Sequence, residues 1–204
     1  MKRKIFVATL TVSLAAFWGC SKQADNKETI AGDMERVLKE GIVDKWYPLA
    51  VDTAYGGFLS SFTFDFKPTE NQDKMIVTQS RHTWSNAKAS QIFNDPKYLG
   101  YSKHGFQFLK DVMWDKDHGG FFTLVSRDGK PRQGDTIKTA YGNAFAIFAL
   151  AAYYKASSDT AALNLAKKTF WWLERGSHDP VKLGYFQHLN MNGLPVKRPQ
   201  GWSD

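Results

Sequence analysis

The chain has 204 residues, of which 43% are hydrophobic, 15% aromatic and 23% charged, a composition that supplies a packed core and argues against disorder. Its formal net charge is +7, but Lys and Arg do not cluster with aromatic residues, so we expect no nucleic-acid-binding surface. A single cysteine, Cys20, excludes disulfides within the chain and zinc sites built from several thiolates.

The first 20 residues have the pattern of a secretory signal. A basic start, Met1-Lys-Arg-Lys4, precedes an apolar run from Ile5 to Trp18 that is too short to span a bilayer comfortably. The run ends at Gly19-Cys20, which resembles the lipobox of bacterial lipoproteins. We therefore expect an exported lipoprotein in the periplasm or outer membrane, anchored by a lipid on Cys20, with a polar tether over residues 21–30. The alternative is ordinary signal cleavage nearby, with Cys20 lost.

A glycine-containing phrase then occurs three times, at residues 52–58, 115–121 and 179–185, and we call these segments glycine phrases 1, 2 and 3. Their last glycines, Gly57, Gly120 and Gly184, recur with a period of about 64 residues. Such a period indicates stacked units, none of which can bury its apolar face alone. The glycines suit turns with positive φ, and the following residues, 58–64 and 121–125, have strand-like composition.

Helical segments lie between the phrases. The pattern predicts a first outer helix at 31–50, a first pair of helices at 76–93 and 97–112, and a second pair at 137–156 and 160–175. The first helix of the second pair, 137–156, is apolar on nearly all of its faces, whereas the second helix, 160–175, is amphipathic. Alternating buried and amphipathic helices predict an inner ring of helices surrounded by an outer ring.

Four stretches in the right order resemble the N-acylglucosamine 2-epimerase family, which includes cellobiose and mannobiose 2-epimerases and aldose–ketose isomerases. They are residues 49–58, 78–84 (Thr-Gln-Ser-Arg-His-Thr-Trp), 114–122 and 141–154. The resemblance implies an all-α fold, an (α/α)6 toroid whose inner helices line a sugar pocket. It also implies proton removal from C2 of an opened aldose through an enediolate, with histidines as base and acid and no cofactor.

The resemblance implies a substrate-binding role for four residues. Arg81 matches the family's pocket arginine, suited to sugar hydroxyls and an enediolate oxygen, and Tyr141 matches its pocket tyrosine. Trp84 would stack on a sugar face, and Asn143 stands where the family often has Gln or Asn. The competing interpretations are an Arg81 paired with an acid and a Tyr141 or Trp84 that fills the core.

The family's acid–base histidines belong to segments further along than this chain reaches. Six helix pairs of about 64 residues need roughly 390 residues. We therefore expect residues 31–204 to be a partial toroid of about two and a half hairpins, the N-terminal half of an epimerase, inactive alone. The five histidines show no metal-ligand spacing, so no metal site is expected.

Two other hypotheses remain open. A glycoside hydrolase or lyase on a six-hairpin scaffold needs paired carboxylates about 5–10 Å apart. The inner segments 76–93 and 137–156 contain no Asp or Glu, so only loop residues such as Asp115 and Asp117 could serve. The third hypothesis is a non-catalytic, sugar-binding remnant. In each case the expected partner is a small carbohydrate, and the oligomeric state stays open.

Overall fold

The computed structural model describes residues 21–132 and 136–197. It divides into two compact units, Met1–Lys45 and Trp46–Asp204, each described by itself below. The predicted signal segment, with Cys20, lies outside the described residues. Within the described ranges, no helix is both long and apolar enough to cross a membrane.

The first unit is helical where it is described. Helix α1 (Ser21–Arg36) continues into the π-helix η1 (Val37–Val43), and the short helix α2 (Asp44–Trp46) follows at the boundary with the second unit. The segment predicted as a polar tether, 21–30, therefore lies within α1, and the first helix ends four residues before the predicted residue 50. Exposed apolar side chains follow one face of α1 and η1: Ile30, Met34, Val37, Leu38 and Ile42.

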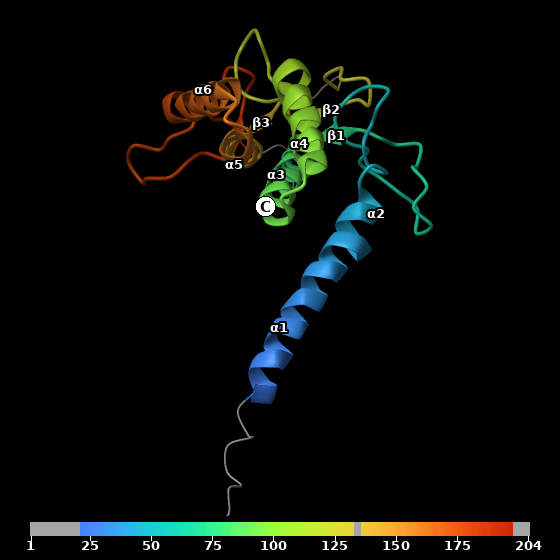
Figure 1. Ribbon diagram of the computed structural model, residues 1–204. Coiled ribbons are helices and arrows are strands. Elements are labelled where there is room, and N and C mark those ends of the chain that lie inside the picture. The colour runs from blue at the N-terminus through green and yellow to red at the C-terminus, as the bar shows by residue number, and fades with distance from the viewer. Residues whose placement is uncertain (1–20, 133–135, 198–204) are drawn as a thin grey trace, which may run out of the picture. The chain divides into compact units, whose positions relative to one another are not determined.

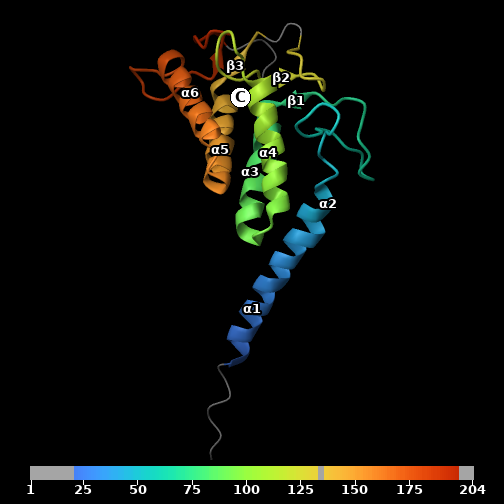
Figure 2. The same ribbon diagram turned by 45° about the horizontal axis from the view of Figure 1, so that its top comes forward.

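The second unit contains two helical hairpins. Helix α3 (Ile76–Phe93) pairs with α4 (Pro96–Phe108), which the π-helix η2 (Leu109–Met113) extends, and α5 (Ala140–Ser157) pairs with α6 (Thr160–Gly176). Helix α3 packs against both α4 and α5, and α5 packs against both α3 and α6 (Figures 1 and 2). The predicted helices and their division into inner and outer members are confirmed to within a few residues.

Local signals set the ends of these helices. The side chains of Asp95, Thr139 and Asp159 cap α4, α5 and α6 by accepting a backbone N–H two or three residues further on. Asn94 and Ser158 end α3 and α5 in the left-handed region, with φ of 48° and 60°. Each inner helix therefore stops abruptly, and its outer partner starts within three residues.

The core lies between the hairpins. Phe106 of α4 stacks on Tyr153 of α5 at 4.8 Å between ring centroids, which joins the outer helix of one hairpin to the inner helix of the next. Apolar burial of this kind supplies most of the stability of such helices. The other large apolar members of the cluster are Ile76, Phe108, Leu109, Met113, Trp114, Phe121, Val125, Leu150 and Leu165.

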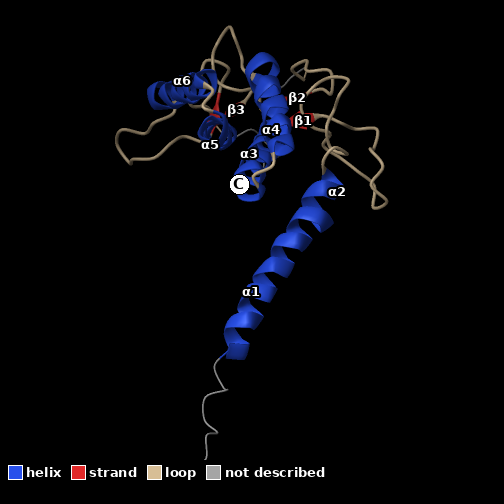
Figure 3. Cartoon of the chain, in the orientation of Figure 1, coloured by secondary structure: helices blue, strands red, loops and turns tan. Residues whose placement is uncertain are grey.

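In the described residues, strands occur only as two short antiparallel pairs, and loops and turns connect them to the helices (Figure 3). Strand β1 (Lys74–Met75) pairs with β2 (Leu124–Val125), and β3 (Lys138–Thr139) pairs with β4 (His188–Leu189). The predicted strand at 58–64 is wrong, because Phe58 and Phe62 form only isolated bridges. One turn inside each of the first two phrases and another a few residues after it reverse the chain before a longer ladder can form.

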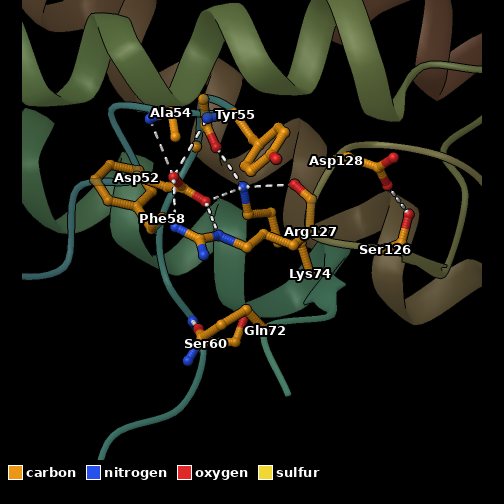
Figure 4. Close-up of polar contacts among 12 residues, drawn as sticks. Asp52, Ala54, Tyr55, Phe58, Ser60, Gln72, Lys74, Ser126, Arg127 and Asp128 are labelled. Atoms are coloured by element: carbon orange, nitrogen blue, oxygen red, sulfur yellow. Dashed lines mark hydrogen bonds and ion pairs between the residues drawn. The ribbon is translucent and has the colours of Figure 1, made fainter. Parts of the chain in front are cut away.

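Two buried lysines hold glycine phrases 1 and 2 in place. Lys74 Nζ donates to Asp52 Oδ2 at 2.9 Å, to the Gly56 carbonyl at 2.5 Å and to the Arg127 carbonyl at 3.1 Å (Figure 4). All three acceptors are therefore satisfied by one ammonium group. Burial raises the pKa of Asp52, but hydrogen bonds from Arg127 and Lys74 outweigh it and lower the pKa to about 2.

The second lysine repeats this arrangement. Lys138 Nζ donates to Asp115 Oδ2 at 2.6 Å, to the Gly119 carbonyl at 2.5 Å and to the Met191 carbonyl at 3.0 Å. The lysine and each of its three acceptors thus recur at the period of the glycine phrases. The repeat seen in the sequence is therefore also a repeat of buried ion pairs.

Two further contacts accompany each lysine. The side-chain amide of Gln79 accepts the Phe58 N–H at 2.8 Å, and that of Asn143 accepts the Phe121 N–H at 2.8 Å. An aromatic ring also covers the last glycine of the phrase, Phe108 over Gly57 and Trp172 over Gly120, so closely that a Cβ would meet either ring at 2.7 Å. We call each set of lysine, amide and aromatic ring a repeat lock. Lock 1 is Lys74, Gln79 and Phe108, and lock 2 is Lys138, Asn143 and Trp172.

Candidate functional site

The inner helices α3 and α5 present one surface that the rest of the second unit leaves uncovered. Arg81 of α3 is exposed, and Tyr141 and Phe148 of α5 are each 51% exposed. The opposite side of α5 is buried at Ala146 and Leu150. Large aromatic side chains held at a solvent-exposed surface are typical of binding sites.

Two of the predicted site residues meet on this surface. The Arg81 guanidinium carbon lies 5.0 Å from the centroid of the Phe145 ring, a cation–π contact. The Tyr141 ring packs edge-on against the same Phe145 ring at 4.8 Å. Phe145 therefore connects the arginine of α3 to the tyrosine of α5. The sequence did not predict this role, because Phe145 is one of many apolar residues in its helix.

A second aromatic contact lies one helical turn further along both helices. Trp84 and Phe148 stack with ring centroids 5.2 Å apart and an interplanar angle of 21°. With Arg81, Tyr141 and Phe145, these rings form a surface that we call the aromatic shelf. Trp84 is thus neither isolated in the core nor fully exposed, and its prediction as a stacking residue stays a prediction.

Asn143 does not belong to the aromatic shelf. Its side chain is buried, its Oδ1 accepts the Phe121 N–H, and its Nδ2 donates to the Thr139 carbonyl at 2.9 Å. A helical residue two positions from Tyr141 faces away from it, because neighbours on one face stand three or four residues apart. The arrangement therefore gives Asn143 a structural role and no support for its predicted contact with substrate.

Gln187 is a neighbour of the site that the sequence did not single out. The Tyr141 backbone N–H donates to Gln187 Oε1 at 3.3 Å, where α5 begins. Gln187 directly precedes β4, so the pairing of β3 with β4 brings it to the start of this helix. The segment with β4 that follows glycine phrase 3 thus borders the shelf at Tyr141.

His82 stands next to Arg81 in sequence but has its side chain elsewhere. Its Nδ1 lies 2.6 Å from the Tyr47 hydroxyl, and its ring stacks on Phe58 at 4.7 Å. Burial lowers the pKa of His82 to about 4, and burial also raises the pKa of Tyr47. His82 is therefore neutral at pH 7, and its ring lies against Tyr47 and Phe58 and not on the shelf.

The side chains of the shelf can bind a ligand, but helices α3 and α5 supply no carboxylate or exposed histidine to act as acid or base. Neither α3 nor α5 contains Asp or Glu, and His82 is the one histidine in the two helices. In the part of the chain that the structure describes, no three His, Cys, Asp or Glu side chains are placed to hold a metal ion. Aromatic faces stack on the C–H faces of sugars, and a guanidinium donates to hydroxyl and oxyanion oxygens.

Comparison with known proteins identifies the family. The sequence profile of N-acylglucosamine 2-epimerase (GlcNAc 2-epimerase) matches residues 56–199, which include both helical hairpins and the shelf. The chain belongs to the N-acylglucosamine 2-epimerase family. The family's members include the cellobiose 2-epimerase of Eubacterium cellulosolvens, to which the chain is 35% identical over 159 residues.

The solved structures agree with this assignment. The cellobiose 2-epimerase from Spirochaeta thermophila superposes with a TM-score of 0.79 and 33% identity over 89% of this chain. The chain spans less than half of these epimerases, 38% of the E. cellulosolvens protein and 44% of the S. thermophila one. The predicted family and the predicted fold, an incomplete (α/α)6 toroid, are thus confirmed.

A more distant likeness extends to glycoside hydrolases. A family 76 glycoside hydrolase, a mannosidase from Bacteroides thetaiotaomicron, superposes over 83% of this chain with a TM-score of 0.62 and 15% identity. At that identity the likeness concerns the fold alone. The toroid therefore does not by itself distinguish an epimerase from a hydrolase, and the side chains of the site have to decide.

Proposed function

We propose that this member of the epimerase family binds a mono- or disaccharide on the aromatic shelf and contributes to C2 epimerisation or aldose–ketose isomerisation. The meeting of Arg81 and Tyr141 at the Phe145 ring carries the proposal, because it joins a cation, a hydroxyl and stacking surfaces within one site. The family to which the chain belongs supports the reaction class.

In the proposed reaction, a base removes the proton from C2 of the opened sugar, and the electron pair moves to the C1 carbonyl oxygen. The resulting enediolate carries its charge on oxygen, where a preorganised guanidinium stabilises it. Return of a proton to the other face of C2 gives the epimer, and return to C1 gives the ketose. Arg81 is suited to hold the oxyanion, and Tyr141 to hold a hydroxyl.

The proton-transfer groups are proposed to come from outside the described residues. His82 is buried and neutral, and α3 and α5 have no carboxylate. The chain alone is therefore proposed to bind sugar without catalysing exchange. The lack of carboxylates on the inner helices also disfavours a glycoside hydrolase, which needs a pair of them.

Binding and exchange can be measured on the same protein. Isothermal titration with glucose, mannose and cellobiose should detect a sugar that binds the wild type and binds Arg81→Ala at least 10-fold more weakly. Lys103→Ala, an exposed residue of the outer helix α4, is the matched control and should bind normally. NMR in deuterated water should show no exchange at C2. Lack of binding by all three sugars would refute the site. Robust exchange at C2 would refute the proposal that the chain alone binds sugar without catalysing exchange.

We also propose that the protein is exported and anchored to a membrane through a lipid on Cys20. The basic start, the short apolar run and Gly19-Cys20 support the proposal. Metabolic labelling with a palmitate analogue should mark the wild type and leave Cys20→Ser unlabelled. Labelling of both proteins, or of neither, would refute lipidation at this residue.

A further inference from the structure

The loops of the second unit form a polar cleft that shares no residue with the aromatic shelf. It is lined by Tyr55 of glycine phrase 1, by residues 70–73 before β1, and by residues 126–128 and Arg132 after β2. We call it the loop cleft. Its volume is about 560 Å³, within the range of roughly 300–1,000 Å³ that small-molecule sites occupy. Every side chain that lines it carries a hydrogen-bonding group, so the loop cleft suits a polar ligand.

Arg127 is fixed in the loop cleft by a buried carboxylate. Its Nε and Nη2 donate to Asp52 Oδ2 and Oδ1 at 3.0 and 3.2 Å, across from the loop after β2 to glycine phrase 1 (Figure 4). Its guanidinium carbon lies 5.3 Å from the centroid of the Tyr55 ring, and Tyr55 is itself 51% exposed. Within residues 21–132 and 136–197, nothing accepts from Arg127 Nη1. That edge of the guanidinium can therefore donate to a ligand.

Arg132 is held in the same way. Its Nε donates to Asp73 Oδ2 at 2.7 Å, and its Nη2 donates to Asp73 Oδ1. Its Nη1 also has no acceptor among the residues that the structure describes. Both arginines thus use one edge on a carboxylate and keep another edge for a ligand. Side chains that are already fixed lose little freedom when a ligand binds, which favours binding.

The second repeat indicates that the fold does not need these two ion pairs. One period later, the counterparts of Asp73, Arg127 and Arg132 are all apolar: Ile137, Met191 and Val196. The backbone contact is nevertheless kept, since the Met191 carbonyl accepts from Lys138 as the Arg127 carbonyl accepts from Lys74. The two repeats therefore share the lysine contact and differ in the side chains around it. Polar side chains that the fold can replace by apolar ones indicate a role in binding.

The charges of the loop cleft disfavour an ionic ligand. Its lining contains two arginines and three carboxylates: Glu70, Asp73 and Asp128. There is thus no excess of positive charge to attract a phosphate or another anion. Asp128 is already paired with Lys130, as Asp73 is with its arginine. In the described ranges, no group of three acidic, His or Cys side chains is placed to hold a metal ion, the loop cleft included.

A neutral polyhydroxyl ligand matches this lining. Sugar hydroxyls both donate and accept hydrogen bonds, so they can bind to carboxylates and to guanidinium groups at once. The C–H face of a sugar ring can pack on the exposed Tyr55 ring. We propose that the loop cleft binds a neutral sugar unit, either a monosaccharide or one residue of an oligosaccharide, at a site separate from the aromatic shelf. The guanidinium edges of Arg127 and Arg132 donate to its hydroxyls, and Tyr55 stacks on its ring.

NMR titration of the full chain tests the proposal. The side-chain Nε–H signal of Arg127 is the reporter, assigned by its loss in Arg127→Met, together with the backbone amides of residues 126–128. Glucose, mannose and cellobiose are added in turn, with glycerol and inorganic phosphate as comparison solutes. We expect at least one sugar to shift these signals in a saturable way. The same shifts should persist in Arg81→Ala, which weakens the aromatic shelf alone.

Three variants identify the groups that bind. Tyr55→Ala removes the ring and should weaken sugar binding at the loop cleft at least 10-fold. Arg127→Met supplies the side chain that the second repeat has at this position and should have a similar effect, read from the backbone amides. Trp171→Ala removes an aromatic side chain of α6 that is 54% exposed, and as the matched control it should bind like the wild type.

Four results would overturn the proposal. The first is that none of the three sugars shifts the reporter signals, and the second is that Tyr55→Ala binds as tightly as the wild type. The third is that phosphate or glycerol shifts the signals as much as the sugars do at equal concentration, which would indicate an anion site or nonspecific contact. The fourth is loss of the shifts in Arg81→Ala, which would show that the loop cleft and the aromatic shelf are one site. Failure of the shelf to bind sugar would leave the expected shifts at the loop cleft unchanged.

Discussion

Replacement of one buried lysine tests how much the repeat locks stabilise the fold. In Lys138→Met the side chain keeps an unbranched apolar stem but loses the ammonium group. Asp115 Oδ2 and the carbonyls of Gly119 and Met191 then lose their shared donor, which lies 2.5 to 3.0 Å from each. Both side chains of the ion pair are buried, so water cannot replace that donor without opening the loop.

The expected loss is about 3 kcal/mol of unfolding free energy, since breaking a buried ion pair by removing one partner costs about 3–5 kcal/mol. We expect the lower end because Asp115 keeps the backbone N–H bonds of Asp117 and His118, and its Oδ2 lies 3.2 Å from His118 Nδ1. Domains are stable by only about 5–15 kcal/mol, so a loss of this size is easily measured.

Urea unfolding followed by circular dichroism and tryptophan fluorescence gives the measurement. Lys130→Met is the matched control, because Lys130 also pairs with an aspartate, Asp128, but its side chain is 80% exposed. The control should leave the urea midpoint unchanged. If Lys138→Met shifted the midpoint no more than the control does, the buried ammonium would not hold the loop and the reasoning would fail.

Three other outcomes are expected. Gly120→Ala should cost about 2–3 kcal/mol in urea unfolding, since its φ is +71° and its Cβ would meet Trp172, whereas Gly100→Ala, with open space in α4, should not destabilise. Because the pKa of Asp52 is lowered to about 2, its contribution of about 2 kcal/mol should be present above pH 4 and lost as the pH falls toward 2, and Asp52→Asn should flatten that dependence. NMR titration of the imidazole signals should leave His82 neutral from pH 7 down to pH 5, and a midpoint above pH 6 would contradict its burial against Tyr47.

The helices were predictable because their signals are local. The periodic apolar residues lie inside the helices that they predict, and the capping residues Asp95 and Asp159 directly precede the helices that they start. The bounds of α3 and α6 could therefore be predicted to within one residue. The strand expected at 58–64 failed because composition alone does not show whether a partner segment is long enough to pair. In this chain the partners contribute one or two residues each.

The site was predictable only in part, because its geometry depends on contacts between distant segments. Arg81 and Tyr141 could be chosen by residue type and family resemblance, but Phe145 had no local signal among the apolar residues of α5. The family resemblance predicted Asn143 as a substrate-binding residue, yet its Oδ1 accepts a backbone N–H 22 residues away. Lys74 and Lys138 recur at the period of the glycine phrases, a spacing visible in the sequence, but lysine is so rarely buried that its residue type predicts an exposed side chain.

The third bond of each lysine has a consequence for how the second unit unfolds. Lys74 of β1 binds Asp52 in glycine phrase 1, which precedes α3, and the Arg127 carbonyl in the loop that follows β2. Its ammonium group therefore joins two segments that lie 75 residues apart in the sequence. Neither the phrase nor the loop can separate without removing an acceptor from a buried ammonium group. Stacked repeats with weak interfaces can fray one at a time. Here the two hairpins are expected to melt together, as one cooperative transition.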